Sequence, residues 1–153
     1  MGKTLDQIDR RILEALQNDA SLSQRALADQ VGLSQNACWR RLKELETSGV
    51  IRGRTILLDR DKVGMGLVTF VFVRTSTHST EWLALFRRHV RTIPEVVDFY
   101  RISGEYDYML KVVTPDIAGF DAVYKRLIDG ASMETVTSFF AMETIEEQRP
   151  IRL

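Results

Sequence analysis

The amino-acid sequence predicts an α+β protein, in which an N-terminal winged helix-turn-helix precedes a ferredoxin-like domain of order βαββαβ. The N-terminal part shows apolar residues at helical spacing. From residue 66 onward, β-branched and aromatic segments alternate with amphipathic ones. A joining segment separates the two patterns. We therefore predict domains at residues 1–54 and 66–153, with a linker at residues 55–65.

Three short helices are expected in the first domain. The first begins after a capping-box signature, Thr4 followed three residues later by Gln7. Its apolar face carries Ile8, Ile12 and Leu16, which recur every four residues. This spacing predicts one buried face on an otherwise polar helix.

The second helix begins near Ser23 and ends at Gly32, a residue suited to the left-handed turn just past a helix end. Ser34 then caps the third helix. The apolar stripe of that helix follows the spacing i, i+4, i+7 and consists of Cys38, Leu42 and Leu45. Two helices joined by a tight glycine turn predict a helix-turn-helix.

The buried stripe places amides and basic residues on the opposite, exposed face of the third helix. Such a helix enters the major groove, where Gln and Asn can pair with adenine and Arg with guanine. After Gly49, residues 50–54 are predicted to form a short strand that serves as a basic wing. The candidate DNA-binding residues are Ser34, Gln35, Asn36, Arg40, Arg41, Lys43, Arg52 and Arg54.

A plainer interpretation of the same charges is a solvated helix in a three-helix bundle. The whole chain has a net charge of zero, although residues 34–54 hold five basic and two acidic residues. That local excess is weak support by itself, because DNA affinity depends on where the phosphate contacts lie. The tight turn, the cap and the basic segment follow one another in the expected order, and this favours DNA binding.

The second domain is predicted to contain four strands and two helices. The strands are residues 66–75, 95–102, 106–113 and 133–142. A helix over residues 79–90 carries Leu83, Phe86 and Val90 on one face. The turn Ser103-Gly104-Glu105 joins the two middle strands, and Thr114-Pro115 opens the last helix as its cap and first residue. The apolar stripe of this last helix is Ile117, Phe120, Tyr124 and Leu127.

Both faces of the predicted sheet are apolar. The first strand carries Leu67, Val71 and Val73 on one face and Val68, Phe70 and Phe72 on the other, and Phe139 and Phe140 alternate in the last strand. The two helices can cover only one face. A second copy of the sheet is the simplest cover for the other, so we expect a dimer, and a two-fold dimer matches a palindromic DNA site.

Several function classes are disfavoured. The single cysteine, Cys38, cannot form an internal disulfide, and neither a secretory signal nor a membrane span is evident, which fits a cytoplasmic protein. One cysteine and two separated histidines, His78 and His89, give no metal-ligand spacing. We predict no cofactor, no metal and no enzymatic activity.

The chain resembles the Lrp/AsnC family of transcription regulators over almost its whole length. The resemblance rests on LDQIDRRILEALQNDASLSQRALADQVGLS, CWRRLKELETSGVI, SGEYDYML and TSFFAMETI, of which the last two are the more specific. The details CWRRLK, HSTEW and SFFAME are most similar to a branch linked to cysteine-responsive regulation.

The resemblance implies a sequence-specific regulator of transcription whose oligomeric state and DNA binding respond to an amino acid, here cysteine or another small one. Family members form dimers through the second domain and often octameric rings of dimers, with the amino acid in a cleft between dimers. The residues carried over to that cleft are Tyr100, Gly104, Glu105, Asp107 and Ser138. Many members have a proline-glycine turn before the last strand, where this chain has the shorter DGASMETV.

Two rival functions stay open at this point. Some tetrapyrrole-modifying decarboxylases resemble the family, have lost DNA binding and employ histidine. His78 and His89 lie in polar surroundings that suggest ordinary surface residues. A stand-alone amino-acid sensor is the other rival, although the basic residues of the third helix and the wing are present and disfavour it.

Overall fold

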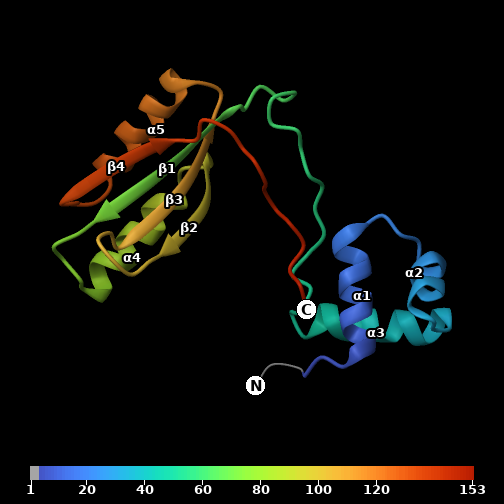
Figure 1. Ribbon diagram of the computed structural model, residues 1–153. Coiled ribbons are helices and arrows are strands. Elements are labelled where there is room, and N and C mark those ends of the chain that lie inside the picture. Colours follow the sequence, from blue (N-terminus) through green and yellow to red (C-terminus); the bar gives the residue numbers. More distant parts are fainter. Residues whose placement is uncertain (1–3) are drawn as a thin grey trace. The chain divides into compact units, whose positions relative to one another are not determined.

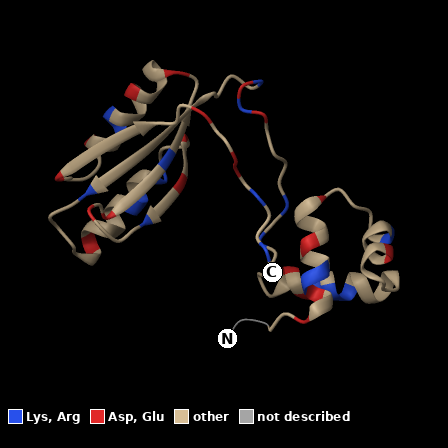
Figure 2. Ribbon diagram, viewed as in Figure 1, with Lys and Arg blue, Asp and Glu red and all other residues tan. Residues whose placement is uncertain are grey.

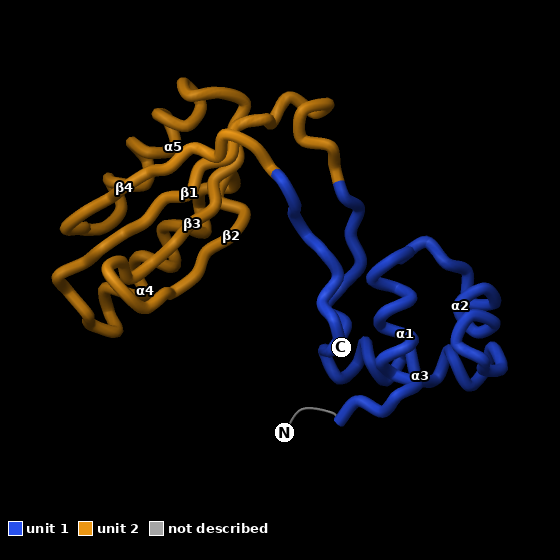
Figure 3. The backbone as a smooth tube through the Cα atoms, viewed as in Figure 1, with its two compact units in different colours: residues 1–57, 145–153 blue, residues 58–144 orange. Residues whose placement is uncertain are grey.

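The computed structural model describes residues 4–153 and contains two compact units (Figure 3). One unit comprises the residues up to Leu57 together with Ile145–Leu153, and the other is Leu58–Thr144. The sequence assigned the last residues to the second domain, whereas they pack with the first. Gln17 explains this placement, because its side-chain amide donates to the Ile151 carbonyl at 3.0 Å and its side-chain carbonyl accepts from the Ile151 N–H at 2.7 Å.

The first unit is built from three helices, α1 (Gln7–Asn18), α2 (Gln24–Val31) and α3 (Gln35–Thr47) (Figure 1). Their shared core is apolar and includes the fully buried Ile12, Leu27 and Leu45. The N-cap of α1 is Asp6 and not the predicted Thr4, since the Asp6 side chain accepts the N–H of Asp9. Asp6 directly precedes the first helical residue, and a carboxylate is favoured at the positive end of a helix.

The turn between α2 and α3 depends on Gly32, as predicted. This residue has a φ of 73°, in the left-handed region, and its N–H bonds to the carbonyls of Ala28 and Asp29. A Cβ in this conformation costs roughly 1–2 kcal/mol. The structure therefore assigns Gly32 a backbone role that sets the direction in which α3 leaves the turn.

Gly32→Ala is expected to lower the free energy of unfolding by about 1–2 kcal/mol, because alanine resists a positive φ. The measurement is urea unfolding followed by circular dichroism. Gly53→Ala is the matched control, since Gly53 has no positive φ and its added Cβ meets nothing within 4 Å. Equal stability of the two variants would contradict the assignment.

The prediction that residues 50–54 form the strand of a wing is wrong. These residues form an irregular segment in which Ile51 donates its N–H to Leu45 and packs against the core of the three helices. A strand needs a neighbouring backbone that satisfies its N–H and C=O groups. In the described part of this single chain, no segment pairs with residues 50–54 as a strand.

The second unit has the predicted order βαββαβ (Figure 1). Its elements are β1 (Leu67–Arg74), α4 (Thr80–Val90), β2 (Val96–Arg101), β3 (Tyr108–Thr114), α5 (Ile117–Asp129) and β4 (Thr135–Phe140). All pairs are antiparallel, in the sheet order β2-β3-β1-β4. This is the ferredoxin-like arrangement that the sequence predicts.

Helix α5 begins two residues later than predicted. Thr114 is the last residue of β3, and Asp116 is the N-cap, with its side chain accepting the N–H of Gly119 at 2.8 Å. The predicted core residue Ile117 is 67% exposed, and Val123, which the predicted stripe left out, is buried on the apolar face.

The two faces of the sheet differ in what covers them. Helices α4 and α5 pack on the face that carries Val71, Val73 and Leu110. The opposite face, here called the open face, is largely apolar, and none of the helices among the described residues covers it (Figure 1). Its residues include Phe70, Phe72, Tyr100, Met109 and Phe139. The alternation predicted from the sequence is therefore confirmed.

Candidate DNA interface and effector site

The orientation of α3 is set by its N-terminus and its buried stripe. The Ser34 hydroxyl accepts the N–H of Ala37 at 3.3 Å, so its role in the structure is that of the cap. Cys38, Leu42 and Leu45 are the buried residues of the helix, as predicted. The exposed side of the same helix carries Gln35, Asn36, Arg40 and Lys43. We call these four residues the reading face.

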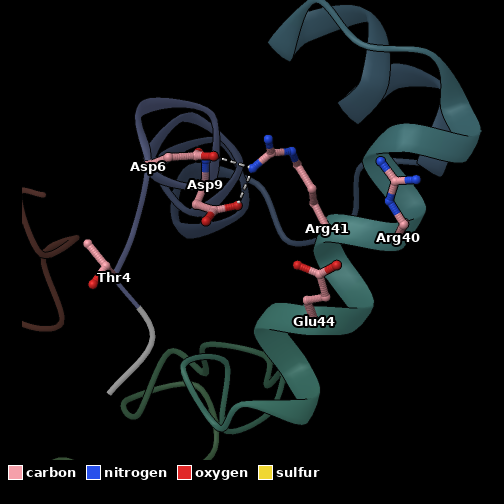
Figure 4. Close-up of a pocket in the computed structure, with 6 residues that line it drawn as sticks. All are labelled: Thr4, Asp6, Asp9, Arg40, Arg41 and Glu44. Atoms are coloured by element: carbon pink, nitrogen blue, oxygen red, sulfur yellow. Dashed lines mark hydrogen bonds and ion pairs between the residues drawn. The ribbon is translucent and has the colours of Figure 1, made fainter. Parts of the chain in front are cut away.

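Arg40 and Arg41 are neighbours with different surroundings (Figure 4). Arg41 turns toward α1, where its Nη1 lies 2.5 Å from an Asp6 carboxylate oxygen and 3.0 Å from one of Asp9. Arg40 points away from both carboxylates. Arg41 is one of the predicted DNA contacts, and in the structure its guanidinium joins α3 to α1 through these two carboxylates. The sequence alone did not indicate this pair, because the partners lie more than thirty positions apart.

These groups line an open polar pocket in the first unit, together with Thr4 and Glu44 (Figure 4). The Asp9 N–H bond is the main cause that lowers the pKa of Asp6, and the hydrogen bond from Arg41 adds to it. The two aspartates raise the pKa of Arg41 above its ordinary value. Asp6, Asp9 and Arg41 are therefore already paired with one another, and these ion pairs hold α3 against α1.

The Asp6–Arg41 pair predicts a dependence of stability on pH. Because the pKa of Asp6 is lowered in the folded state, its contribution is present above the ordinary value of 3.8 and is lost as the pH falls through the folded pKa. In Arg41→Met, the free energy of unfolding is expected to fall less steeply below that pH than it does in the wild type. The check is urea unfolding of both proteins at pH 7, 4 and 3. Parallel pH profiles would contradict a role for this pair, and Arg40→Met is the matched control.

Three other predicted DNA contacts, Lys43 of α3 and the two arginines that follow the helix, are exposed. Glu46 lies 3.8 Å from the Lys43 Nζ and 3.5 Å from an Arg54 nitrogen. Exposed pairs of this kind contribute about 0–1 kcal/mol, so both bases can exchange Glu46 for a phosphate at little cost. Arg52 is exposed on the same segment. Figure 2 shows basic and acidic positions interspersed in this unit, which agrees with recognition by placement of charge and not by bulk charge.

Trp39 is a surface residue that the list of candidate contacts left out. It is 52% exposed and lies within one helical turn of Gln35, Asn36 and Lys43. The spacing of four residues from Gln35 and Lys43 was the available signal. The polar residues of the reading face therefore adjoin a large, exposed aromatic side chain.

Three of the candidate effector-binding residues, Gly104, Glu105 and Asp107, lie at the β2–β3 hairpin. Gly104 has a φ of 129°, and Glu105 beside it is exposed. Asp107 has a structural role, because its carboxylate accepts the N–H of Thr75 at 2.8 Å and lies 3.8 Å from the His78 ring. A turn with open amide groups and a nearby carboxylate suits the two charged ends of an amino acid.

Tyr100 and Ser138 lie on opposite faces of the sheet. Tyr100 is opposite Met109, which pairs with Phe72 on the open face. Ser138 is opposite Val71, which belongs to the helix-covered face. A single copy of the chain therefore does not bring these two residues to one ligand.

In residues 4–153, no group of three or more His, Cys, Asp and Glu side chains is arranged to hold a metal ion. No helix in that same range has the length and apolar character needed to cross a bilayer.

Comparison with protein families accounts for both units. Residues 5–52 match the model described as winged helix-turn-helix DNA-binding. Residues 68–151 match the model described as Lrp/AsnC ligand binding domain. The two matches agree with the predicted fold, and the second includes residues 145–151, which pack with the helical unit in the structure.

Individual relatives and structures are similar over nearly the whole chain. The DNA-binding transcriptional activator DecR of Escherichia coli K12 is 46% identical over 93% of this chain and 94% of its own. A crystal structure of an AsnC family transcriptional regulator from Agrobacterium tumefaciens has a TM-score of 0.89, 50% identity and 94% coverage of each chain. A transcriptional regulator of Neisseria meningitidis in complex with L-Met has a TM-score of 0.89 and 32% identity, over 97% of this chain and 96% of the other. These proteins are named as regulators and not as enzymes, in agreement with the non-enzyme prediction.

Proposed function

The chain belongs to the Lrp/AsnC family of transcriptional regulators, and from that premise we propose that it binds a palindromic operator as a dimer and that a small amino acid changes this binding. The observation that carries the proposal is the reading face. Its amides and Arg40 project from a capped helix whose buried side is fixed against α1 and α2. Such a protein acts where the chromosome lies, so we place it in the cytoplasm.

In this proposal the reading face and the basic segment have separate tasks. Gln35, Asn36 and Arg40 contact base edges in the major groove and specify the site. Lys43, Arg52 and Arg54 contact phosphates, which positions the protein without reading sequence. Ser34 contributes as the cap of α3, and Arg41 as its anchor to α1.

Dimer formation is supported by the open face. Tyr100 and Phe139 are each more than half exposed there in the single chain. Apolar surface on this scale is unfavourable in water, and burying it contributes roughly 25 cal/mol per Å². A second copy of the sheet covers it with matching chemistry and gives the two-fold symmetry that a palindromic site requires. We further propose that such dimers assemble into rings, as octamers.

An amino acid is the proposed effector, and cysteine or another small one is the first candidate. The hairpin at Gly104 offers amide groups to a carboxylate, and Glu105 offers a carboxylate to an ammonium group. Asp107 is already bonded to Thr75, so we place it at the wall of the site. Because Tyr100 and Ser138 face opposite ways, a site that includes both needs residues from more than one copy. Effector binding would then change how copies associate.

The test is binding to DNA from immediately upstream of the protein's own gene, compared with scrambled DNA of the same length at two salt concentrations. Each titration is repeated with cysteine and with a pool of the other amino acids. We expect a preference for the upstream DNA, a steep salt dependence and a shift in affinity or assembly with one amino acid. Equal binding of both DNAs would overturn the DNA-reading proposal, and an unchanged titration with every amino acid would overturn the effector proposal.

A further inference from the structure

The chain has two tryptophans whose surroundings differ. Trp82 is 8% exposed, stacks on Phe86 with ring centroids 4.9 Å apart, and donates its indole N–H to the Ser132 carbonyl at 2.8 Å. Its burial and its hydrogen bond explain it as a core residue of the second unit. Trp39 is 52% exposed on α3, so core packing does not account for it.

The position of Trp39 places it inside the reading face. Residues three and four apart are neighbours on a helix surface, so Trp39 adjoins Gln35, Asn36 and Lys43. Side chains on a helix lean toward its N-terminus. In a helix-turn-helix this is the end of the second helix that approaches base edges. In the proposed complex with DNA, the indole would therefore face the floor of the groove together with the two amides.

The chemistry of the indole restricts what it can recognise there. It has one N–H donor and no acceptor, and most of its surface is apolar. On the major-groove edges of the four base pairs, the one apolar group is the 5-methyl of thymine. We propose that Trp39 is a specificity-determining residue whose indole packs against the 5-methyl group of a thymine. This inference rests on the proposed DNA-binding function.

The geometry also restricts where that thymine lies. Side chains one helical turn apart have Cβ atoms about 5–6 Å apart. The base-pair rise along one strand is about 3.4 Å. The thymine should therefore lie within about two base pairs of the base that Asn36 contacts.

The experiment uses the full chain and the tightest-binding duplex recovered from a random-sequence pool. Each thymine in that duplex is replaced in turn by 2′-deoxyuridine, which removes only the methyl group. The series is measured with the wild type, Trp39→Ala, Trp39→Phe and Asn36→Ala. A buried methyl corresponds to about 0.8 kcal/mol, or about fourfold in affinity.

We expect Trp39→Ala to weaken binding of the recovered duplex about tenfold and to leave random DNA nearly unaffected. One deoxyuridine position should weaken the wild type about fourfold and have no further effect on Trp39→Ala. Trp39→Phe should keep part of the methyl effect. The thymine whose replacement weakens wild-type binding should lie within about two base pairs of the position at which Asn36→Ala no longer discriminates between bases.

Several outcomes would overturn the inference. Equal loss on recovered and random DNA would make Trp39 a contact to the sugar-phosphate backbone. Additive effects of Trp39→Ala and deoxyuridine at every position would mean that the indole touches no methyl. A lowered melting temperature of Trp39→Ala would make the residue structural. Failure of the pool to yield any preferred duplex with the wild type would instead refute the proposed function itself.

Discussion

Phe139→Asp is expected to break the proposed dimer into monomers and to weaken operator binding by about 10²–10⁴-fold. Phe139 is 54% exposed on the open face, with its ring 5.7 Å from that of Phe72. A carboxylate at this position would have to be buried without a partner in the dimer. In a dimer, the second half-site is bound at a high effective concentration, and a monomer loses that advantage.

The measurements are sedimentation equilibrium and DNA titration on the same samples. Phe139→Leu keeps an apolar side chain and should remain a dimer. Ile128→Asp adds the same charge at a 44% exposed position of α5, on the other side of the sheet, and should also remain a dimer. A Phe139→Asp protein that sediments with the same mass as the wild type would show that the open face is not the dimer interface.

Local signals in the sequence were sufficient for most of the first unit. The end of α2 at Gly32 and the cap of α3 at Ser34 each depend on one residue and its nearest neighbours along the chain. Where two capping residues lie close together, the local signal is ambiguous. Thr114 and Asp116 both suit a helix cap, and the decision falls to tertiary structure, because Thr114 pairs with Leu67 in the sheet.

The candidate site was predictable only as far as it depends on one helix. Periodicity placed Arg40 on the exposed side of α3, but the anchor role of Arg41 depends on Asp6 and Asp9 of another element. The sequence also did not indicate on which face of the sheet Tyr100 lies. The β2–β3 register shifts between Val96 and Asp98, so simple alternation from the start of β2 assigns the wrong face to later residues.

Arg40→Ala is expected to weaken operator binding by about 1–3 kcal/mol per half-site, if Arg40 pairs with a guanine. In the structure Arg40 is exposed on α3 and points away from the carboxylates that hold Arg41. Its loss should remove discrimination at one position of the site and leave random DNA nearly unaffected. The check is a titration of operator and random duplexes, followed by single base-pair changes in the operator.

Arg54→Ala is the matched comparison, because it removes the same charge from the segment after α3. Arg54 has an exposed pair with Glu46 and no place on the reading face. Its loss should weaken operator and random DNA alike and reduce the salt slope by about one unit. Comparing the two variants therefore distinguishes a contact that reads a base from a contact that only binds a phosphate. If Arg40→Ala also weakens both DNAs equally, α3 lies along the backbone and its exposed face does not read bases.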